Sequence, residues 1–217
     1  LEVFGQEHIL GEGCLLPNLI KENQVGNLIL AGPPGSGKTT LATVIAAESG
    51  CKILKINAVT SNVAELRDAL KLARYYGSAN CYLFIDEIHR FNKAQQDLLL
   101  PDVESGNARL IGATTHNPRY YVIDPLLSRC HLFTLEPLSV PVIEGSLRVA
   151  LNDCKRGLGS RSCEADKVIL EQIALLAEGD LRRGYNFLET IVEALPVGAK
   201  LTDKELAVFS RERNIRY

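Results

Sequence analysis

Gly32-Pro33-Pro34-Gly35-Ser36-Gly37-Lys38-Thr39 fits the pattern G-x-x-x-x-G-K-[ST] at every position. Its glycines permit backbone angles that turn successive N–H groups inward, which makes a nest for anionic oxygens. A short apolar run at 27–31 precedes the loop and predicts a buried strand, and residues 39–48 follow it with helical periodicity. Because the positive end of that helix faces the loop, this segment predicts a phosphate-binding site between a strand and a helix.

Two side chains of this loop have expected roles in binding a nucleoside triphosphate. Lys38 is expected to reach the β- and γ-phosphates, and the hydroxyl of Thr39 is expected to ligate Mg²⁺. The backbone from Gly32 through Thr39, continuing to Thr40 in the first turn of the helix, is expected to hold the phosphate groups. The chain is therefore predicted to bind ATP together with Mg²⁺.

Four further apolar runs alternate with amphipathic stretches, and they lie at 51–56, 82–85, 109–113 and 131–135. Thr60 or Ser61 is expected to cap the helix that follows the first of these runs and ends near Gly77. Strands that are buried on both faces and separated by helices indicate a parallel sheet with right-handed crossovers. Residues 1–137 are thus predicted to form an α/β domain with a five-stranded parallel sheet between helices.

Beyond residue 137 the pattern changes, and only helical periodicity remains. Helices are expected at about 142–155, 165–178, 181–194 and 203–213. Residues 138–217 are therefore predicted to form a small, all-helical second domain.

Asp86 and Glu87 follow directly after the apolar run at 82–85. In a parallel sheet the carboxyl ends of the strands meet at one edge, so Asp86 is expected beside the loop, holding Mg²⁺ through water. Glu87 is then placed to orient and deprotonate the attacking water. A protein that only held nucleotide would need Asp86 but not Glu87, so the second carboxylate favours hydrolysis.

Three more side chains are candidates for contact with the γ-phosphate. Thr115 ends the fourth strand, and Arg182 opens a helix of the second domain. Arg129 precedes the fifth strand and cannot easily reach its own nucleotide, but an arginine from a neighbouring subunit can stabilise the transferring phosphate. That reading implies an oligomer with ATP at its interfaces. Taken singly, Thr115 would belong to a strand-end turn, Arg129 would be a solvated charge, and Arg182 would lie in an exposed first turn of a helix.

The order of these motifs resembles that of the AAA+ ATPases, and within them the clamp-loader-like group. Three segments look still more like the replication-associated recombination protein A family, which includes the Werner-helicase-interacting ATPases: 4–10, 86–97 and 111–118. The resemblance covers nearly the whole chain. It implies a P-loop AAA+ domain followed by a helical lid, with Thr115 as sensor 1, Arg129 as the arginine finger and Arg182 as sensor 2.

The resemblance adds two further expectations about the site. Backbone at Phe4, Gly5 and Gln6 would line the adenine pocket. Asn57, at the end of the second strand, would hold the catalytic glutamate inactive until DNA binds, although an asparagine at a strand end is also an ordinary turn residue. His116 departs from the family, which more often has Glu at this position.

The partners are also implied by resemblance. The family acts on DNA at stalled or damaged forks, which points to fork or single-strand/duplex junction DNA, with replication proteins as candidate partners. Its tetramer forms largely through a C-terminal domain, which is expected to begin about where this chain ends. The net charge of −2 gives no such indication, and the basic helix face made by Arg67, Lys71 and Arg74 favours a solvated surface over a phosphate contact.

Composition predicts a soluble, intracellular protein, located in the cytoplasm or nucleoid, or in the nucleus if the source is eukaryotic. No apolar run approaches the roughly 20 residues of a membrane helix, and the first residues lack the features of a signal peptide. The six cysteines show neither a C-x-x-C pair nor metal-ligand spacing, so they are expected to be reduced thiols.

Three alternatives to a fork-remodelling ATPase share parts of this motif pattern. Holliday-junction branch-migration motors share the sequence Gly112-Ala113-Thr114-Thr115, but a winged-helix domain after the lid would be needed to favour one. A clamp-loader subunit would share the same site. A non-enzymatic scaffold typically loses the loop lysine or the Asp-Glu pair, and here both are intact.

Overall fold

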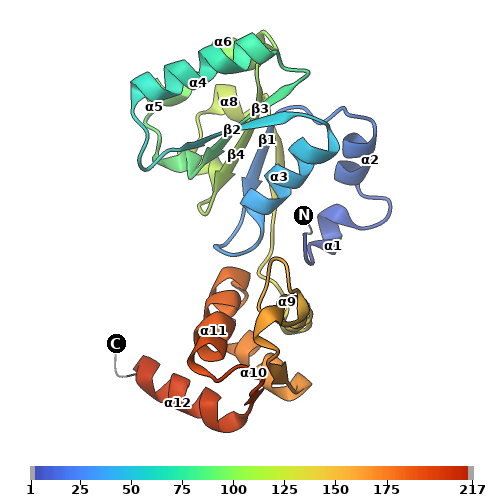
Figure 1. The fold of residues 1–217 in the computed structure, drawn as a ribbon. Coiled ribbons are helices and arrows are strands. Elements are labelled where there is room, and N and C mark those ends of the chain that lie inside the picture. Colours follow the sequence, from blue (N-terminus) through green and yellow to red (C-terminus); the bar gives the residue numbers. More distant parts are fainter. Residues whose placement is uncertain (1–2, 215–217) are drawn as a thin grey trace. The chain divides into compact units, whose positions relative to one another are not determined.

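The computed structural model describes residues 3–214 of the chain. The chain divides into two compact units between Glu136 and Pro137 (Figure 1).

The first unit contains a five-stranded sheet in the order β2-β3-β4-β1-β5. The strands are β1 (Leu28–Ala31), β2 (Lys52–Asn57), β3 (Cys81–Asp86), β4 (Arg109–Thr114) and β5 (His131–Thr134). All four pairings are parallel, so the carboxyl ends of all five strands lie at one edge. The predicted five-stranded parallel α/β fold is confirmed.

Both faces of this sheet are covered, because the apolar side chains of the central strands alternate between two cores. Leu28, Leu30 and Phe84 pack with α3 (Lys38–Glu48) on one face. Ile29, Leu83 and Ile85 pack with α4 (Val63–Tyr76) on the other. Figure 1 shows α3, α1 and α2 on one side of the sheet and α4 on the opposite side.

Short helices fill the connections of this unit. They are α1 (Glu7–Leu10), α2 (Leu15–Lys21), η1 (Ile88–Arg90), α5 (Lys93–Asp97), α6 (Leu100–Glu104), α7 (Pro118–Tyr121) and α8 (Asp124–Leu127). The start of α4 corrects one expectation: Asn62, rather than Thr60 or Ser61, caps the helix. The Asn62 side chain accepts from the Glu65 N–H, and the Glu65 carboxylate accepts from the Asn62 N–H.

The second unit is built from four main helices around a core that includes Leu147, Leu170 and Leu188. They are α9 (Val140–Asn152), α10 (Lys167–Ala177), α11 (Leu181–Ala194) and α12 (Asp203–Asn214), with a short 3-10 turn, η2 (Gly159–Arg161). Two two-residue strands, β6 (Glu164–Ala165) and β7 (Lys200–Leu201), form a parallel pair that the sequence did not predict. Two residues are too few to leave an alternating pattern.

Among the described residues, no helix combines the length and the apolar character required to cross a bilayer.

Candidate active site

The loop at 32–39 connects the end of β1 to the start of α3. Gly35 (φ 66°) and Gly37 (φ 100°) both adopt left-handed backbone, which glycine enters without a steric penalty. Gly37 is also the N-cap of α3, so the unpaired N–H groups of the first helical turn face the loop. The Gly32 N–H donates to Thr114 O at 3.1 Å, which fastens the start of the loop to the end of β4.

The interior of the loop suits a polyphosphate anion. The Lys38 side chain is buried, and its Nζ donates to Gly32 O and Pro33 O, both at 2.7 Å. The Ser36 hydroxyl donates to Pro33 O at 2.8 Å. A Cβ at Gly32 would lie 2.6 Å from Leu135 O, so this position has no room for a side chain. A cation and a helix N-terminus therefore converge on one backbone nest.

Asp86 and Glu87 lie at the carboxyl edge of the sheet, where β3 ends. Glu87 has φ 55°, an uncommon left-handed conformation for a residue with a side chain. Its Oε2 accepts from the Thr115 hydroxyl at 3.3 Å, just beyond the end of β4. The structure thus brings together two of the predicted site residues, Glu87 and Thr115.

The same edge suits a divalent cation that arrives with phosphate. Thr39 lies in the first turn of α3 and Asp86 ends β3, so both belong to this edge. Within residues 3–214, no group of three or more His, Cys, Asp or Glu side chains forms a metal site on its own. Mg²⁺ commonly binds through one or two protein ligands plus phosphate and water, so this donor set fits Mg²⁺.

Gln6 is buried and has a structural role that the sequence did not indicate. Its side-chain Nε2 donates to Ser36 O at 3.2 Å and to Glu136 O at 2.8 Å, while its Oε1 accepts from the Glu136 N–H at 2.9 Å. Gly5 and Gln6 both have positive φ, which turns this segment toward the loop. The segment is therefore tied to the phosphate loop by a side chain, whereas only its backbone was expected to matter.

Asn57 ends β2 opposite Asp86 in the sheet register. Its Oδ1 accepts from the Val59 N–H at 2.8 Å, which is the ordinary turn role of an asparagine at a strand end. Among the described residues, no hydrogen bond joins Asn57 to Glu87.

Arg129 lies at the amino ends of the strands, whereas the phosphate loop lies at their carboxyl ends. Its carbonyl accepts from the side chain of Asn27, the residue before β1, at 3.4 Å. Gly32 follows β1, and five residues of strand span about 17 Å. The Arg129 guanidinium pairs with Glu104 at 2.7 Å and donates to Pro125 O at 2.7 Å. The structure therefore does not bring Arg129 to the loop of its own chain.

Arg182 belongs to the second unit, where it lies exposed in the first turn of α11. The helix is capped by Asp180, whose side chain accepts from the Arg183 N–H at 3.1 Å. The predicted contact of Arg182 with a γ-phosphate remains a prediction.

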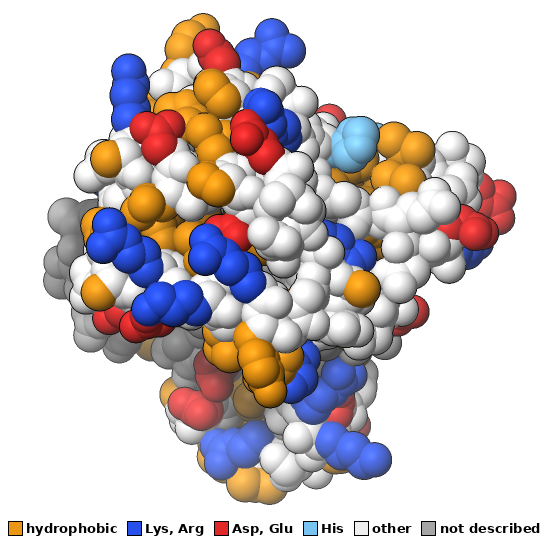
Figure 2. Space-filling view, turned by 90° about the horizontal axis from the view of Figure 1, so that it is seen from above, with side chains coloured by type: hydrophobic (Ala, Val, Ile, Leu, Met, Phe, Trp, Pro, Cys, Tyr) orange, Lys and Arg blue, Asp and Glu red, His pale blue; other side chains and the backbone are white. Residues whose placement is uncertain are grey.

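The basic face of α4 is largely paired with carboxylates. Arg74 donates to both oxygens of the buried Asp102, at 2.5 and 2.7 Å, and Lys71 pairs with Asp68 at 2.9 Å. Figure 2 shows one face of the molecule on which basic side chains are interspersed with acidic and hydrophobic ones. Because Arg74 and Lys71 are already paired with carboxylates of the same chain, the α4 face is poorly suited to phosphate contact.

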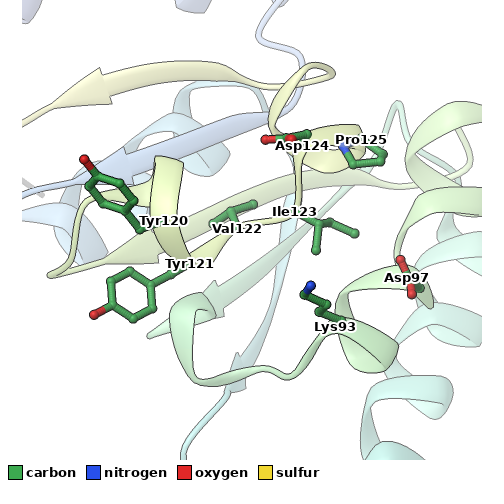
Figure 3. Close-up of a pocket in the computed structure, with 8 residues that line it drawn as sticks. All are labelled: Lys93, Asp97, Tyr120, Tyr121, Val122, Ile123, Asp124 and Pro125. Carbon is green, nitrogen blue, oxygen red and sulfur yellow. The ribbon is translucent and has the colours of Figure 1, made fainter.

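A cleft of about 430 Å³ lies apart from the phosphate loop, between α5, α7 and α8 (Figure 3). Its lining residues are Lys93, Asp97, Tyr120, Tyr121, Val122, Ile123, Asp124 and Pro125. None of the predicted site residues lines it.

Comparison with known proteins places this fold and site in a family. Residues 28–137 match the ATPase family associated with various cellular activities (AAA). The match runs from β1 to the end of the first unit and includes the loop, Asp86, Glu87, Thr115 and Arg129. The chain belongs to this family.

Within the family, the resemblance to replication-associated recombination protein A is confirmed. The protein of that name from Escherichia coli strain K12 is 40% identical over 100% of this chain and 50% of its own length. Its counterpart from Haemophilus influenzae is 41% identical over 88% and 44%. The ATPase WRNIP1 of Dictyostelium discoideum is 38% identical over 89% and 22%. The chain spans about half the length of the two bacterial relatives.

A solved structure is similar over the same range. The Holliday junction branch migration motor RuvB of Thermotoga maritima has a TM-score of 0.77 and 26% identity, covering 96% of this chain and 69% of its own. The likeness to this motor is one of structure.

Proposed function

We propose that this chain hydrolyses ATP with Mg²⁺ and acts on DNA in replication-associated recombination and repair. The observation that carries the ATPase proposal is the contact between Glu87 and Thr115 at the strand edge that also bears the intact phosphate loop. The intact Lys38, Asp86 and Glu87 argue against a non-enzymatic scaffold.

In the proposed complex, the loop from Gly32 to Thr40 surrounds the triphosphate, and its backbone N–H groups from Gly35 onward and the ammonium of Lys38 hold the phosphates. Backbone at 4–6 lines the adenine pocket. The Thr39 hydroxyl and Asp86 would hold Mg²⁺, with Asp86 acting through water. When bound, the cation neutralises charge on the phosphate oxygens.

Glu87 acts as general base toward a water molecule in line with the γ-phosphate. The water oxygen forms a bond to the γ-phosphorus as Glu87 takes its proton, and the bond from that phosphorus to the β–γ bridging oxygen breaks. The products are ADP and inorganic phosphate, and Glu87 then releases its proton to solvent. The Thr115 hydroxyl orients the water and the γ-phosphate, and Arg182 contacts the γ-phosphate from the second unit.

Arg129 stabilises the transferring phosphate on a neighbouring subunit. Its position at the opposite edge of the sheet from its own loop supports this role in trans. The active form would therefore be an oligomer, and by family resemblance the full-length protein would be a tetramer.

The DNA part of the proposal rests on the names of the relatives, since the charge pattern does not carry it. Fork or single-strand/duplex junction DNA is the proposed substrate, with replication proteins as further partners and an intracellular, DNA-associated location. The likeness to RuvB supports the fold and does not by itself favour branch migration.

The test is the ATPase rate of the full-length protein with Mg²⁺ or EDTA, with and without junction DNA. We expect turnover that needs Mg²⁺ and rises with junction DNA. Absence of turnover with both Mg²⁺ and DNA would overturn the enzyme proposal. A rate that junction DNA leaves unchanged would remove the DNA-stimulated part.

A further inference from the structure

Three aromatic side chains form a cluster against the proposed catalytic carboxylate. The rings of His89, on η1, and His116, after β4, lie 4.1 Å apart and are tilted by 39°. Tyr121, on α7, places its ring edge against both, with centroids at 5.9 and 4.9 Å. The His89 side chain is only 4% exposed.

His89 contacts Glu87 directly. Its Nδ1 lies 3.2 Å from Glu87 Oε2 and 3.0 Å from the Thr114 hydroxyl. A ring nitrogen without a proton would repel an ionised carboxylate at this distance, so the geometry requires the Nδ1–H form. The bonds of Thr114 agree with this tautomer of His89. The Thr114 hydroxyl donates its proton to His116 O at 3.3 Å and accepts from the His116 N–H at 3.0 Å, so toward His89 it can only accept.

His116 makes the matching contact with Thr115. Its Nδ1 lies 3.2 Å from the Thr115 hydroxyl oxygen, whose single proton is directed at Glu87 Oε2. A proton on His116 Nδ1 completes a short relay, in which His116 donates to Thr115 and Thr115 donates to Glu87. Each histidine therefore holds one of the two residues proposed to face the γ-phosphate.

Both contacts reach the same carboxylate oxygen. Oε2 of Glu87 is held by His89 and Thr115, while no group of the described residues donates to Oε1. Oε1 is thus left to accept a proton from water. The left-handed backbone at Glu87 turns its side chain toward His89, two residues further on, and such strain persists only where surrounding contacts fix it.

We propose that His89 and His116 are positioning residues, which orient Glu87 and Thr115 for ATP hydrolysis. The inference rests on the proposed ATPase function and extends it to two side chains that contact Glu87 and Thr115. This orienting role differs from the one that the family resemblance implies for Asn57, which is to hold the glutamate inactive; here Asn57 bonds Val59, and His89 contacts Glu87.

The electrostatics agree with a neutral His89 at neutral pH. Burial lowers the pKa of the His89 imidazole below its usual value, against the Glu87 carboxylate, which raises it. His116 and Arg90 lower it further, and the neighbouring Thr114 hydroxyl and Tyr121 ring carry no charge that would favour the protonated imidazole. A neutral ring with its proton on Nδ1 donates to Glu87 without neutralising the carboxylate as a base.

Variants at His89 and His116, with one control, test the proposal through turnover and nucleotide affinity. We expect His89→Ala to lower kcat by about tenfold while the Kd for a fluorescent ATP analogue changes less than about twofold, since misplacement affects the chemical step. His89→Asn keeps a donor near the Nδ1 position and should recover most of kcat. His89→Gln moves the donor to the Nε2 position and should resemble His89→Ala. His131→Ala, an exposed histidine on β5, is the matched control.

Thermal unfolding of each variant shows whether it folds. If His89→Ala does not fold, the comparison of His89→Asn with His89→Gln still tests the proposal. Equal kcat in His89→Asn and His89→Gln, or a kcat for folded His89→Ala at or above wild type, would overturn the proposal. For His116→Ala we expect a loss of a few-fold in kcat, again with unchanged affinity.

A second measurement does not depend on turnover. Long-range ¹H–¹⁵N spectra of the imidazole rings should show the Nδ1–H tautomer for His89, with a resonance that shifts in Glu87→Gln. An Nε2–H tautomer at His89 would overturn the positioning role. If wild-type protein failed to hydrolyse ATP, the proposed function would fall, and the spectra would still decide whether His89 holds Glu87.

Discussion

Gln6 and Glu136, which are 130 residues apart, exchange two hydrogen bonds through the Gln6 side-chain amide and the Glu136 backbone. A third bond links the same amide to Ser36 O in the phosphate loop. One side chain therefore ties together the N-terminal segment, the loop and the last residue of the first unit.

Gln6→Ala should destabilise the first unit by about 2–3 kcal/mol, because it leaves the buried carbonyl of Ser36 and two partly buried backbone groups of Glu136 without these partners. Urea unfolding monitored by circular dichroism measures the change. Gln24→Ala, at an exposed glutamine in the same N-terminal region, is the control and should be neutral. Equal stability of the two variants would show that the three bonds contribute little.

Gly32→Ala should weaken both folding and ATP binding. The added Cβ would lie 2.6 Å from Leu135 O and 2.9 Å from Leu135 Cβ, and the backbone oxygen cannot move aside as a side-chain end can. Overpacking of this kind costs about 1–3 kcal/mol. Gly26→Ala, where a Cβ meets nothing within 4 Å, is the matched control. The measurements are thermal unfolding and nucleotide affinity, and a Gly32→Ala variant as stable as Gly26→Ala contradicts the prediction.

The sequence predicts well those elements whose structure depends on residues adjacent in the chain. The loop at 32–39, the strand before it and the helix after it form one continuous pattern. The buried strand β3 was visible in the same way, because every residue from Cys81 to Ile85 is apolar and buried. Local chemistry and the fold agree at these positions, so the five-stranded sheet followed from pattern alone.

The features that sequence did not predict depend on contacts between distant segments. Nothing near Gln6 indicates that its amide will meet Glu136. The sequence around His89 and His116 likewise does not indicate that their rings lie together beside Glu87. Arg74 looked like one member of a solvated basic face, yet it binds the buried Asp102. Partners of this kind become apparent only when the chain has folded.

Glu87→Gln should lower kcat by roughly 10²–10⁴ while leaving ATP binding intact, because the amide keeps the shape of the side chain but cannot take a proton from water. Lys38→Ala should instead weaken binding. Single-turnover hydrolysis and equilibrium binding of a fluorescent ATP analogue separate the two effects. Normal turnover in Glu87→Gln would remove Glu87 as the base.

Arg129→Ala and Lys38→Ala should each be inactive alone and regain activity when mixed. A mixed oligomer contains sites in which a subunit with an intact loop receives Arg129 from its neighbour. The measurement is the ATPase rate of the full-length variants at equal total concentration, alone and after mixing, with size-exclusion chromatography to confirm assembly. Absence of recovery in assembled mixtures would count against Arg129 acting in trans.

Cys130, beside Arg129, should resist alkylation. Burial raises the pKa of its thiol to about 12, so the thiol stays protonated as pH rises through 8, and the thiolate is the reactive form. Cys154 is exposed and should react first. Iodoacetamide labelling at pH 8, followed by peptide mass spectrometry over time, orders the two sites. Labelling of Cys130 as fast as Cys154 would show that this segment opens to solvent.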